Sequence, residues 1–226
     1  MTSYTWSFGF VFTNGSYLLA GLLGALQLAI GALVLGGIIG LPIGLCRVSR
    51  FRVVRILTAG YVNIFRNTPA VVQLLWFYYA LPILLGIQLS PFVAALIAFS
   101  LATAAYVAEI VRAGIEAIPR GQSEAATALG LNYFRRMRLV ILPQALRHMI
   151  PAFTNQAIDI VKLTAISSMI AYGDLVYHAQ VLATQEFRPI EAYSAVAVIY
   201  SLILIPLSHI ALRIEKHYRR RRTNQG

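Results

Sequence analysis

Two oppositely charged residues stand close together in a stretch of the chain that is otherwise mostly apolar. Asp159 and Lys162 are three residues apart, which would place both on one face of a helix. An ionisable group at bilayer depth usually faces a cavity or pairs with another charge. With Asn155, Thr164 and Ser167 nearby, the pair could recognise the ammonium and carboxylate groups of an amino acid. It could equally be a structural ion pair or a contact with another subunit.

A second polar group stands where a basic segment meets an apolar one. Arg66 and Asn67 come just before Pro69, and proline should disturb a helix there and free backbone groups for polar contacts. Arg66 could line the inner end of a pathway, or its side chain could simply extend to the membrane surface. Glu109 and Arg112 are again three residues apart, and we expect them to form a salt bridge at the membrane interface.

Apolar stretches must hold these side chains in place. The chain of 226 residues is 58% hydrophobic and only 12% charged, whereas soluble domains have about 25% charged residues. A helix needs about 17–25 mostly apolar residues to cross a bilayer. We therefore predict an all-α integral membrane protein with residues 1–226 in a single membrane domain. The five predicted spans are about 18–45, 69–85, 92–111, 145–171 and 192–212.

The basic residues predict the orientation of these spans. Most of them fall in three clusters, at 47–55, 112–147 and 213–222, and five crossings that start outside place all three clusters on the same side. Cytoplasmic loops are enriched in Lys and Arg, so we predict an external N-terminus and a cytoplasmic C-terminal tail, residues 213–226. Residues 1–17 contain no Lys or Arg, so we expect no cleaved signal peptide.

Two short helices fit the polar segment between the third and fourth spans. Ser123 or a residue just before it could cap the first helix, with Glu124 in its first turn. Gly130 could adopt the left-handed conformation that ends a helix. Asn132 could cap the second helix, which should stop before Pro143.

The first of these helices has an unusually small surface. Ala125, Ala126 and Ala128 offer almost no side-chain bulk, so the groove of another protein could approach the backbone closely. The alternative is an ordinary amphipathic helix that lies on the lipid headgroups.

Other kinds of chemistry find no support in the sequence. Cys46 is the only cysteine and the four histidines are scattered, so we expect neither a disulfide nor a metal site. The motifs of metalloproteases and serine hydrolases are absent, and we do not expect an enzyme. The net charge is +11, but the basic residues mostly fall in short runs between apolar stretches and are not interleaved with base-stacking aromatic residues, so we expect no nucleic-acid partner.

The segment from 114 to 143 contains a spaced motif. The coupling loop in permease subunits of ATP-binding-cassette importers has a characteristic pattern. The pattern is Glu-Ala-Ala, then three residues, Gly, nine residues, Ile, one residue and Leu-Pro. Here it is met by Glu124-Ala125-Ala126, Gly130 and Leu142-Pro143, with Val140 at the Ile position. The chain therefore resembles a type I importer permease of the bacterial inner membrane. The resemblance implies that a separate ATPase is contacted through Gly121, Glu124, Ala125, Ala126 and Gly130.

The resemblance also implies a set of partners. These are a dimer of ATP-binding-cassette ATPase subunits, a second permease that is identical or homologous, and a periplasmic or lipid-anchored amino-acid binding protein. Membrane lipid surrounds the assembly. ATP and Mg²⁺ would be bound by the ATPase, and this chain would bind no cofactor.

Residues 61–79 and 106–122 are similar to the branch of the family that imports polar amino acids such as glutamate, aspartate, glutamine and histidine. Within this branch, residues 61–79 look most similar to permeases for glutamate, aspartate or their amides. Relatives commonly have Lys-Asp-Thr-Ser-Leu where this chain has residues 162–166 as Lys-Leu-Thr-Ala-Ile, so their substrate contacts do not carry over directly. The alternative is a secondary amino-acid transporter with Asp159 as its ion site, although such a carrier would not need the coupling loop.

Overall fold

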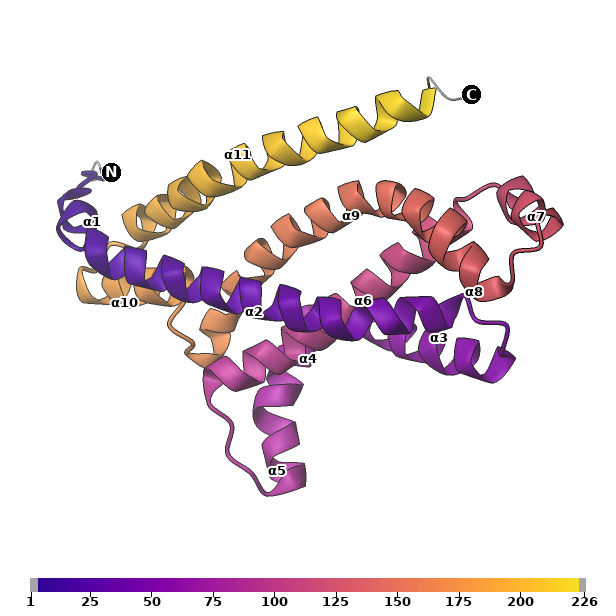
Figure 1. The fold of residues 1–226 in the computed structure, drawn as a ribbon. Coiled ribbons are helices and arrows are strands. Elements are labelled where there is room, and N and C mark those ends of the chain that lie inside the picture. The colour runs from indigo at the N-terminus through magenta and orange to yellow at the C-terminus, as the bar shows by residue number, and fades with distance from the viewer. Residues whose placement is uncertain (1–3, 224–226) are drawn as a thin grey trace. The chain divides into compact units, whose positions relative to one another are not determined.

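The computed structural model describes residues 4–223, with side chains up to Lys216, and all regular structure within these residues is helical (Figure 1). The all-α prediction is confirmed. The elements are α1 (Gly9–Thr13), α2 (Gly15–Arg47), α3 (Arg52–Asn67), α4 (Ala70–Leu75), the π-helix η1 (Trp76–Ala80), α5 (Leu81–Leu85), α6 (Pro91–Glu116), α7 (Arg120–Ala128), α8 (Tyr133–Arg136), the π-helix η2 (Met137–Ile141), α9 (Leu142–Leu163), the 3₁₀ helix η3 (Thr164–Ile170), α10 (Leu175–Gln185) and α11 (Pro189–Thr223).

Three single helices are long and apolar enough to cross a membrane. They are α2, α6 and α11, and they correspond to the first, third and fifth predicted spans. The second and fourth predicted spans lie in two bent pairs of helical segments. The first pair is α3 and the segment from α4 to α5, and the second is the segment from α8 to η3 and α10. If each bent pair is counted as one crossing, the described residues contain up to five crossings. Each candidate crossing therefore contains more residues than the corresponding apolar run in the sequence.

The chain forms two compact units. The first consists of Met1–Ala32, Ala70–Phe99 and Asp159–Leu207, and the second of Leu33–Pro69, Ser100–Ile158 and Ser208–Gly226. The long helices α2, α6, α9 and α11 each contribute to both units.

The core of the first unit joins α2, α10 and α11. Its buried residues include Leu18 and Leu22 of α2, Leu175 of α10 and Val196 of α11. Glycine makes this packing feasible, because a Cβ atom at Gly21 would lie only 2.2 Å from a ring nitrogen of the α10 histidine. Small residues at such contacts are typical of packed membrane helices.

The core of the second unit is built on α6. Val107, Val111 and Ile115 of α6 pack with Ile141 and Met149 from η2 and α9. The glycines of α2 again permit a close approach, here to α6, with added Cβ atoms within 3 Å of neighbouring atoms at Gly36, Gly40 and Gly44.

The prediction that a helix stops before Pro143 is wrong. α8, η2 and α9 follow one another without a break, so the polar segment runs directly into the fourth predicted span. Proline lacks a backbone N–H and its ring crowds the carbonyl of the residue four positions earlier. The π-helical turn just before α9 changes that local geometry, and the helix continues through the proline.

Three helices, α1, α3 and α10, are absent from the sequence prediction, and the last two are the longer ones. α3 has a buried Val62 on one side and exposed Ile56, Leu57 and Ile64 on the other. α10 is capped by Asp174, whose carboxylate accepts a hydrogen bond of 2.7 Å from the backbone N–H of Tyr177. Both helices are short and mixed in polarity, so neither stands out as an apolar run.

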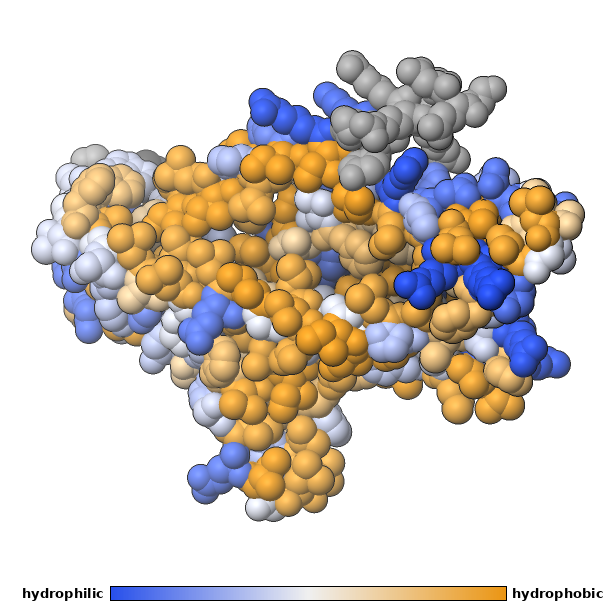
Figure 2. All heavy atoms as spheres, in the orientation of Figure 1, coloured by the Kyte–Doolittle hydropathy of each residue, from blue (hydrophilic) through white to orange (hydrophobic). Residues whose placement is uncertain are grey.

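The surface reflects these elements. Figure 2 shows hydrophobic residues over most of α5, and a mixture of hydrophilic and hydrophobic residues over α7 and α8. Ile83, Leu84 and Leu85 of α5 are exposed, as expected for side chains in contact with lipid or with another membrane protein.

Candidate functional site

The α7 helix presents most of the residues expected to contact an ATPase. Gly121, Glu124 and Ala125 are exposed, and a Cβ atom at Gly121 would meet nothing within 4 Å. Ala126 differs, since only 3% of it is exposed, and α7 lies against η2. The predicted alanine surface is therefore divided: Ala125 faces outward, whereas Ala126 holds the helix to the rest of the second unit.

The start of α7 differs from the prediction. The helix begins at Arg120 after Pro119, and no side chain caps it. Ser123 is therefore not a cap, and its backbone carbonyl instead accepts a hydrogen bond from the Thr127 hydroxyl. Glu124 lies beyond the first turn. Pro119 itself occupies the cap position, with an extended ψ of 137°, and the helix starts directly after it.

The end of α7 confirms the prediction for Gly130. Its φ is +76°, its N–H bonds the carbonyl of Thr127, and the next N–H, of Leu131, bonds the carbonyl of Ala126. These two bonds make a Schellman motif, for which a left-handed glycine is strongly preferred. The motif turns the chain sharply away from α7.

A short polar connection joins α7 to the helix that follows. The Asn132 side chain accepts a 2.9 Å hydrogen bond from the Arg135 N–H, which confirms it as the cap of α8. Arg136 donates to the Thr127 hydroxyl at 2.6 Å. Because α8 continues through η2 into α9, these bonds link α7 mechanically to the long α9 helix.

Apolar side chains flank the outer face of α7. Leu129 is 81% exposed and Phe134 is 76% exposed. Exposed bulky apolar residues beside a small helix surface are typical of a protein contact. The sequence interpretation missed them because it considered the alanines alone.

The charged pair of α9 forms as predicted. Lys162 Nζ lies 3.2 Å from Asp159 Oδ1, and both side chains are exposed. Asn155 is also exposed and lies one helical turn before Asp159, which places all three on one side of α9.

Thr164 and Ser167 do not belong to this exposed set. Both are fully buried. Thr164 donates to the carbonyl of Val161, and the Ser167 hydroxyl lies 2.6 Å from the carbonyl of Thr164 and 3.1 Å from Asp174 Oδ2. The chain changes from α to 3₁₀ helix at Thr164, so the spacing that aligns the earlier residues no longer applies.

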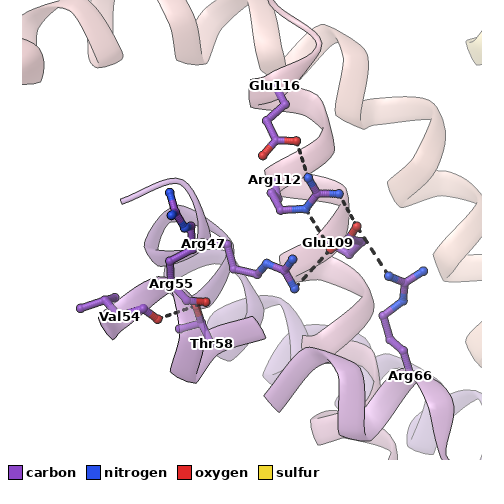
Figure 3. A network of polar contacts seen from close by, with 8 residues as sticks. All are labelled: Arg47, Val54, Arg55, Thr58, Arg66, Glu109, Arg112 and Glu116. Atoms are coloured by element: carbon purple, nitrogen blue, oxygen red, sulfur yellow. Dashed lines mark hydrogen bonds and ion pairs between the residues drawn. The ribbon is translucent and has the colours of Figure 1, made fainter. Parts of the chain in front are cut away.

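Glu109 is the centre of a charge network in the second unit (Figure 3). The predicted pair with Arg112 is confirmed, with Arg112 Nη2 at 2.5 Å and Nε at 3.1 Å from the carboxylate. Arg47 of α2 and Arg66 of α3 approach the same carboxylate at 3.5 Å and 3.6 Å. Arg112 also pairs with Glu116. The network thus joins α2, α3 and α6.

Arg66 is held in position by more than its charge. Its guanidinium lies 5.4 Å from the centre of the Tyr106 ring, a favourable cation–π distance. Asn67 is exposed and ends α3, and the chain is extended at Thr68 before Pro69. The predicted disturbance of the helix at this proline is confirmed.

Comparison with known proteins identifies the chain at this point. The family described as "Binding-protein-dependent transport system inner membrane component" matches residues 32–224. The chain belongs to this family. It is a multi-pass membrane transport component and not an enzyme, since the ATPase of such systems is a separate subunit.

Relatives of this permease match along most of their length. It is 38% identical over 200 residues to a putative glutamine permease, GlnP, of Rickettsia bellii, covering 88% of this chain and 92% of the relative. It is also 38% identical over 200 residues to the arginine permease ArtQ of Bacillus subtilis, with 88% and 91% covered. The glutamate/aspartate permease GltK of Escherichia coli is 37% identical over 199 residues, with 85% and 89% covered.

Solved structures agree with the fold of this permease. A crystal structure of an amino acid ABC transporter with histidines superposes with a TM-score of 0.89 at 33% identity, covering 95% of this chain and 100% of the other. The MetNI methionine transporter in an inward-facing conformation gives 0.72 at 23% identity, covering 89% and 95%. The predicted type I importer permease fold is confirmed.

Proposed function

We propose that this permease is the translocating subunit of an ATP-driven importer of polar amino acids and works by alternating access. The observation that carries the proposal is α7: a small-residue helix that is closed by a glycine Schellman motif and exposes Gly121, Glu124 and Ala125, three of the residues predicted to contact the ATPase. The relatives named for glutamine, arginine and glutamate/aspartate transport support the substrate class. Glutamate, aspartate or their amides are the proposed cargo.

The contacts of α7 suggest how movement would reach the pathway. An ATPase that displaces α7 would also displace α8, because Arg136 and the Asn132 turn tie the two together. The Gln144 amide donates to the Gln122 side chain at 3.2 Å, which adds a direct tie from α9 to α7. Since α9 carries Asp159 and Lys162, the displacement would change the access of solvent to that pair.

The proposed assembly contains two copies of an ATP-binding-cassette ATPase with ATP and Mg²⁺, a second permease and an amino-acid binding protein. Residues 1–226 act as one membrane domain in it. The N-terminus is external and the C-terminal tail cytoplasmic, as the three basic clusters indicate. An ion-gradient carrier is disfavoured because the chain belongs to a binding-protein-dependent family.

Asp159, Lys162 and Asn155 are the proposed substrate contacts. An exposed carboxylate and ammonium 3.2 Å apart can separate to pair with the ammonium and carboxylate of an amino acid, at the expense of one weak exposed salt bridge. Arg66 and Asn67 are proposed to line the inner end of the pathway.

The test is uptake by vesicles that contain the permease and its ATPase. The double variant E124K with G130P should lose ATP-dependent amino-acid uptake by about tenfold or more, because proline cannot adopt the positive φ at 130 and the charge on the docking face is reversed. E186K, which reverses an exposed charge at the end of α10, is the matched control and should transport normally. Unchanged uptake by the double variant would refute the coupling role.

A further inference from the structure

An apolar groove runs along the first unit, between α1, the beginning of α2 and the beginning of α11. Its volume is about 490 Å³. The walls include Phe8, Phe12, Leu19, Leu22, Val198 and Ile199. Leu19 and Val198 are more than half exposed, and both lie in candidate membrane spans. The groove therefore opens on a surface that faces the bilayer or a neighbouring membrane protein.

The rim of the groove carries the aromatic residues of a membrane interface. Tyr4 and Trp6 meet edge to face with ring centres 5.5 Å apart, and Trp6 stacks on Phe8 at 5.8 Å. Phe8 is itself part of the wall. Tyr and Trp are concentrated at the level of the lipid headgroups, so the rim marks the polar end of the groove and the apolar walls continue into the hydrocarbon region.

This rim is firmly attached to α11. The fully buried Glu191 carboxylate accepts hydrogen bonds from the Tyr4 hydroxyl at 2.5 Å and the Ser7 N–H at 3.2 Å. Arg188 donates to the same carboxylate at 2.9 Å and to the carbonyl of Thr5 at 3.0 Å. The aromatic segment thus has a fixed position, and the mouth of the groove is built into the fold.

The lining suits a flexible chain better than a helix. Helix contacts within membranes are rich in small residues that let backbones approach. On α2 these residues already face other parts of the chain, as at Gly21 and Gly36, whereas the groove is walled mainly by bulky Phe, Leu, Val and Ile side chains. A helix is about 10–12 Å wide with its side chains, but an acyl chain can follow an irregular apolar channel.

We propose that the groove between α1, α2 and α11 holds one acyl chain of a membrane phospholipid, with the headgroup at the level of Trp6. An empty apolar groove would forfeit the dispersion contacts of its walls, and water gains no hydrogen bonds there. The lipid fastens the external end of α2 to α11. This site is independent of ATP coupling and of the substrate.

Gly15 provides a clean way to fill the groove. It lines the groove, and a Cβ atom there would meet nothing within 4 Å. Gly37 lies on the same helix with equally open space but outside the groove, so G37F is the matched control for G15F. The full-length variants are reconstituted in vesicles of phosphatidylethanolamine and phosphatidylglycerol, extracted in detergent, washed, and examined by native mass spectrometry.

We expect wild type and G37F to retain a phospholipid and G15F to lose it about tenfold or more, because the new ring replaces the apolar contacts of the acyl chain. S194F, from the opposite wall, should show the same loss and guards against misfolding at one position. The proposal would be overturned if wild type, G15F and S194F retained the same amount of phospholipid. It would also be overturned if G37F lost as much phospholipid as G15F.

A fluorescence measurement locates the lipid. Trp6 and Trp76 are the only tryptophans, so W76F leaves Trp6 as the single reporter beside the groove. Lipid with brominated acyl chains, retained after washing, should quench Trp6 in W76F but not in W76F with G15F. Alternatively, a disulfide between two copies through F12C in a C46S background would show that a second permease covers the groove, and would refute lipid occupancy.

Discussion

Two acidic residues of this permease, Glu109 and Asp159, both pair with a basic residue three positions further on, yet their surroundings differ. The Glu109 side chain is 21% exposed and is approached by three arginines from α2, α3 and α6. The Asp159 side chain is 65% exposed, and among the described side chains its ion-pair partner is Lys162, on its own helix. The same sequence spacing therefore produces a tertiary junction in one place and an isolated surface pair in the other.

The two carboxylates are therefore suited to different roles: one stabilises the packing of helices, and the other is accessible to a ligand. Removing one member of a partly buried, multiply bonded pair leaves the others uncompensated, which is costly. An exposed pair three or four residues apart on a helix contributes only about 0.3–0.5 kcal/mol. Glu109 is thus suited to hold helices together, and the Asp159–Lys162 pair can open for a ligand at little cost.

The largest expected effect is at the Glu109 junction. E109Q leaves Arg47, Arg66 and Arg112 without their shared carboxylate and should destabilise the protein by about 2–4 kcal/mol. Thermal unfolding in detergent would measure the loss. E116Q is the control, because the Glu116 side chain is 54% exposed and its ion-pair partner within residues 4–216 is Arg112, so it should cost less than about 1 kcal/mol. Equal destabilisation by E109Q and E116Q would show that the Glu109 network contributes no more to stability than an exposed salt bridge.

The next effect separates the two roles open to Asp159 and Lys162. The exchange D159K with K162D keeps a salt bridge but reverses its direction. If the pair contacts substrate, the KM for amino-acid uptake should rise about tenfold or more, which corresponds to about 1.4 kcal/mol, while the thermal midpoint stays near that of wild type. Normal uptake by the exchanged protein would assign the pair a structural role only.

The smallest expected effect is at Ser167, and it tests whether this residue lies outside the substrate site. S167A removes a buried hydroxyl that contacts Asp174 and should lower stability by about 1 kcal/mol, with the KM for uptake unchanged. S168A is a close control, since its partly buried hydroxyl donates only to the carbonyl of Ala165. A rise in KM for S167A without loss of stability would return Ser167 to the substrate site.

Some features of this permease followed from local sequence. The long apolar runs of α2, α6 and α11 were recognisable because a bilayer requires about 20 such residues in succession. Gly130 and Asn132 were recognisable because a left-handed turn and a helix cap depend on the residue itself and its immediate neighbours. These predictions concern interactions that span only a few residues.

Other features were decided by the tertiary structure. Arg47 and Arg66 reach Glu109 from helices more than 40 positions away along the chain, and no spacing rule contains such a contact. Ala126 turned inward because α7 packs on η2, and Thr164 and Ser167 became buried because the helix tightened to 3₁₀ geometry beside Asp174. Sequence alone determined the three long apolar helices, α2, α6 and α11, since transfer free energy adds up residue by residue. Only the folded chain determined which polar groups would stay accessible, because burial depends on every neighbour at once.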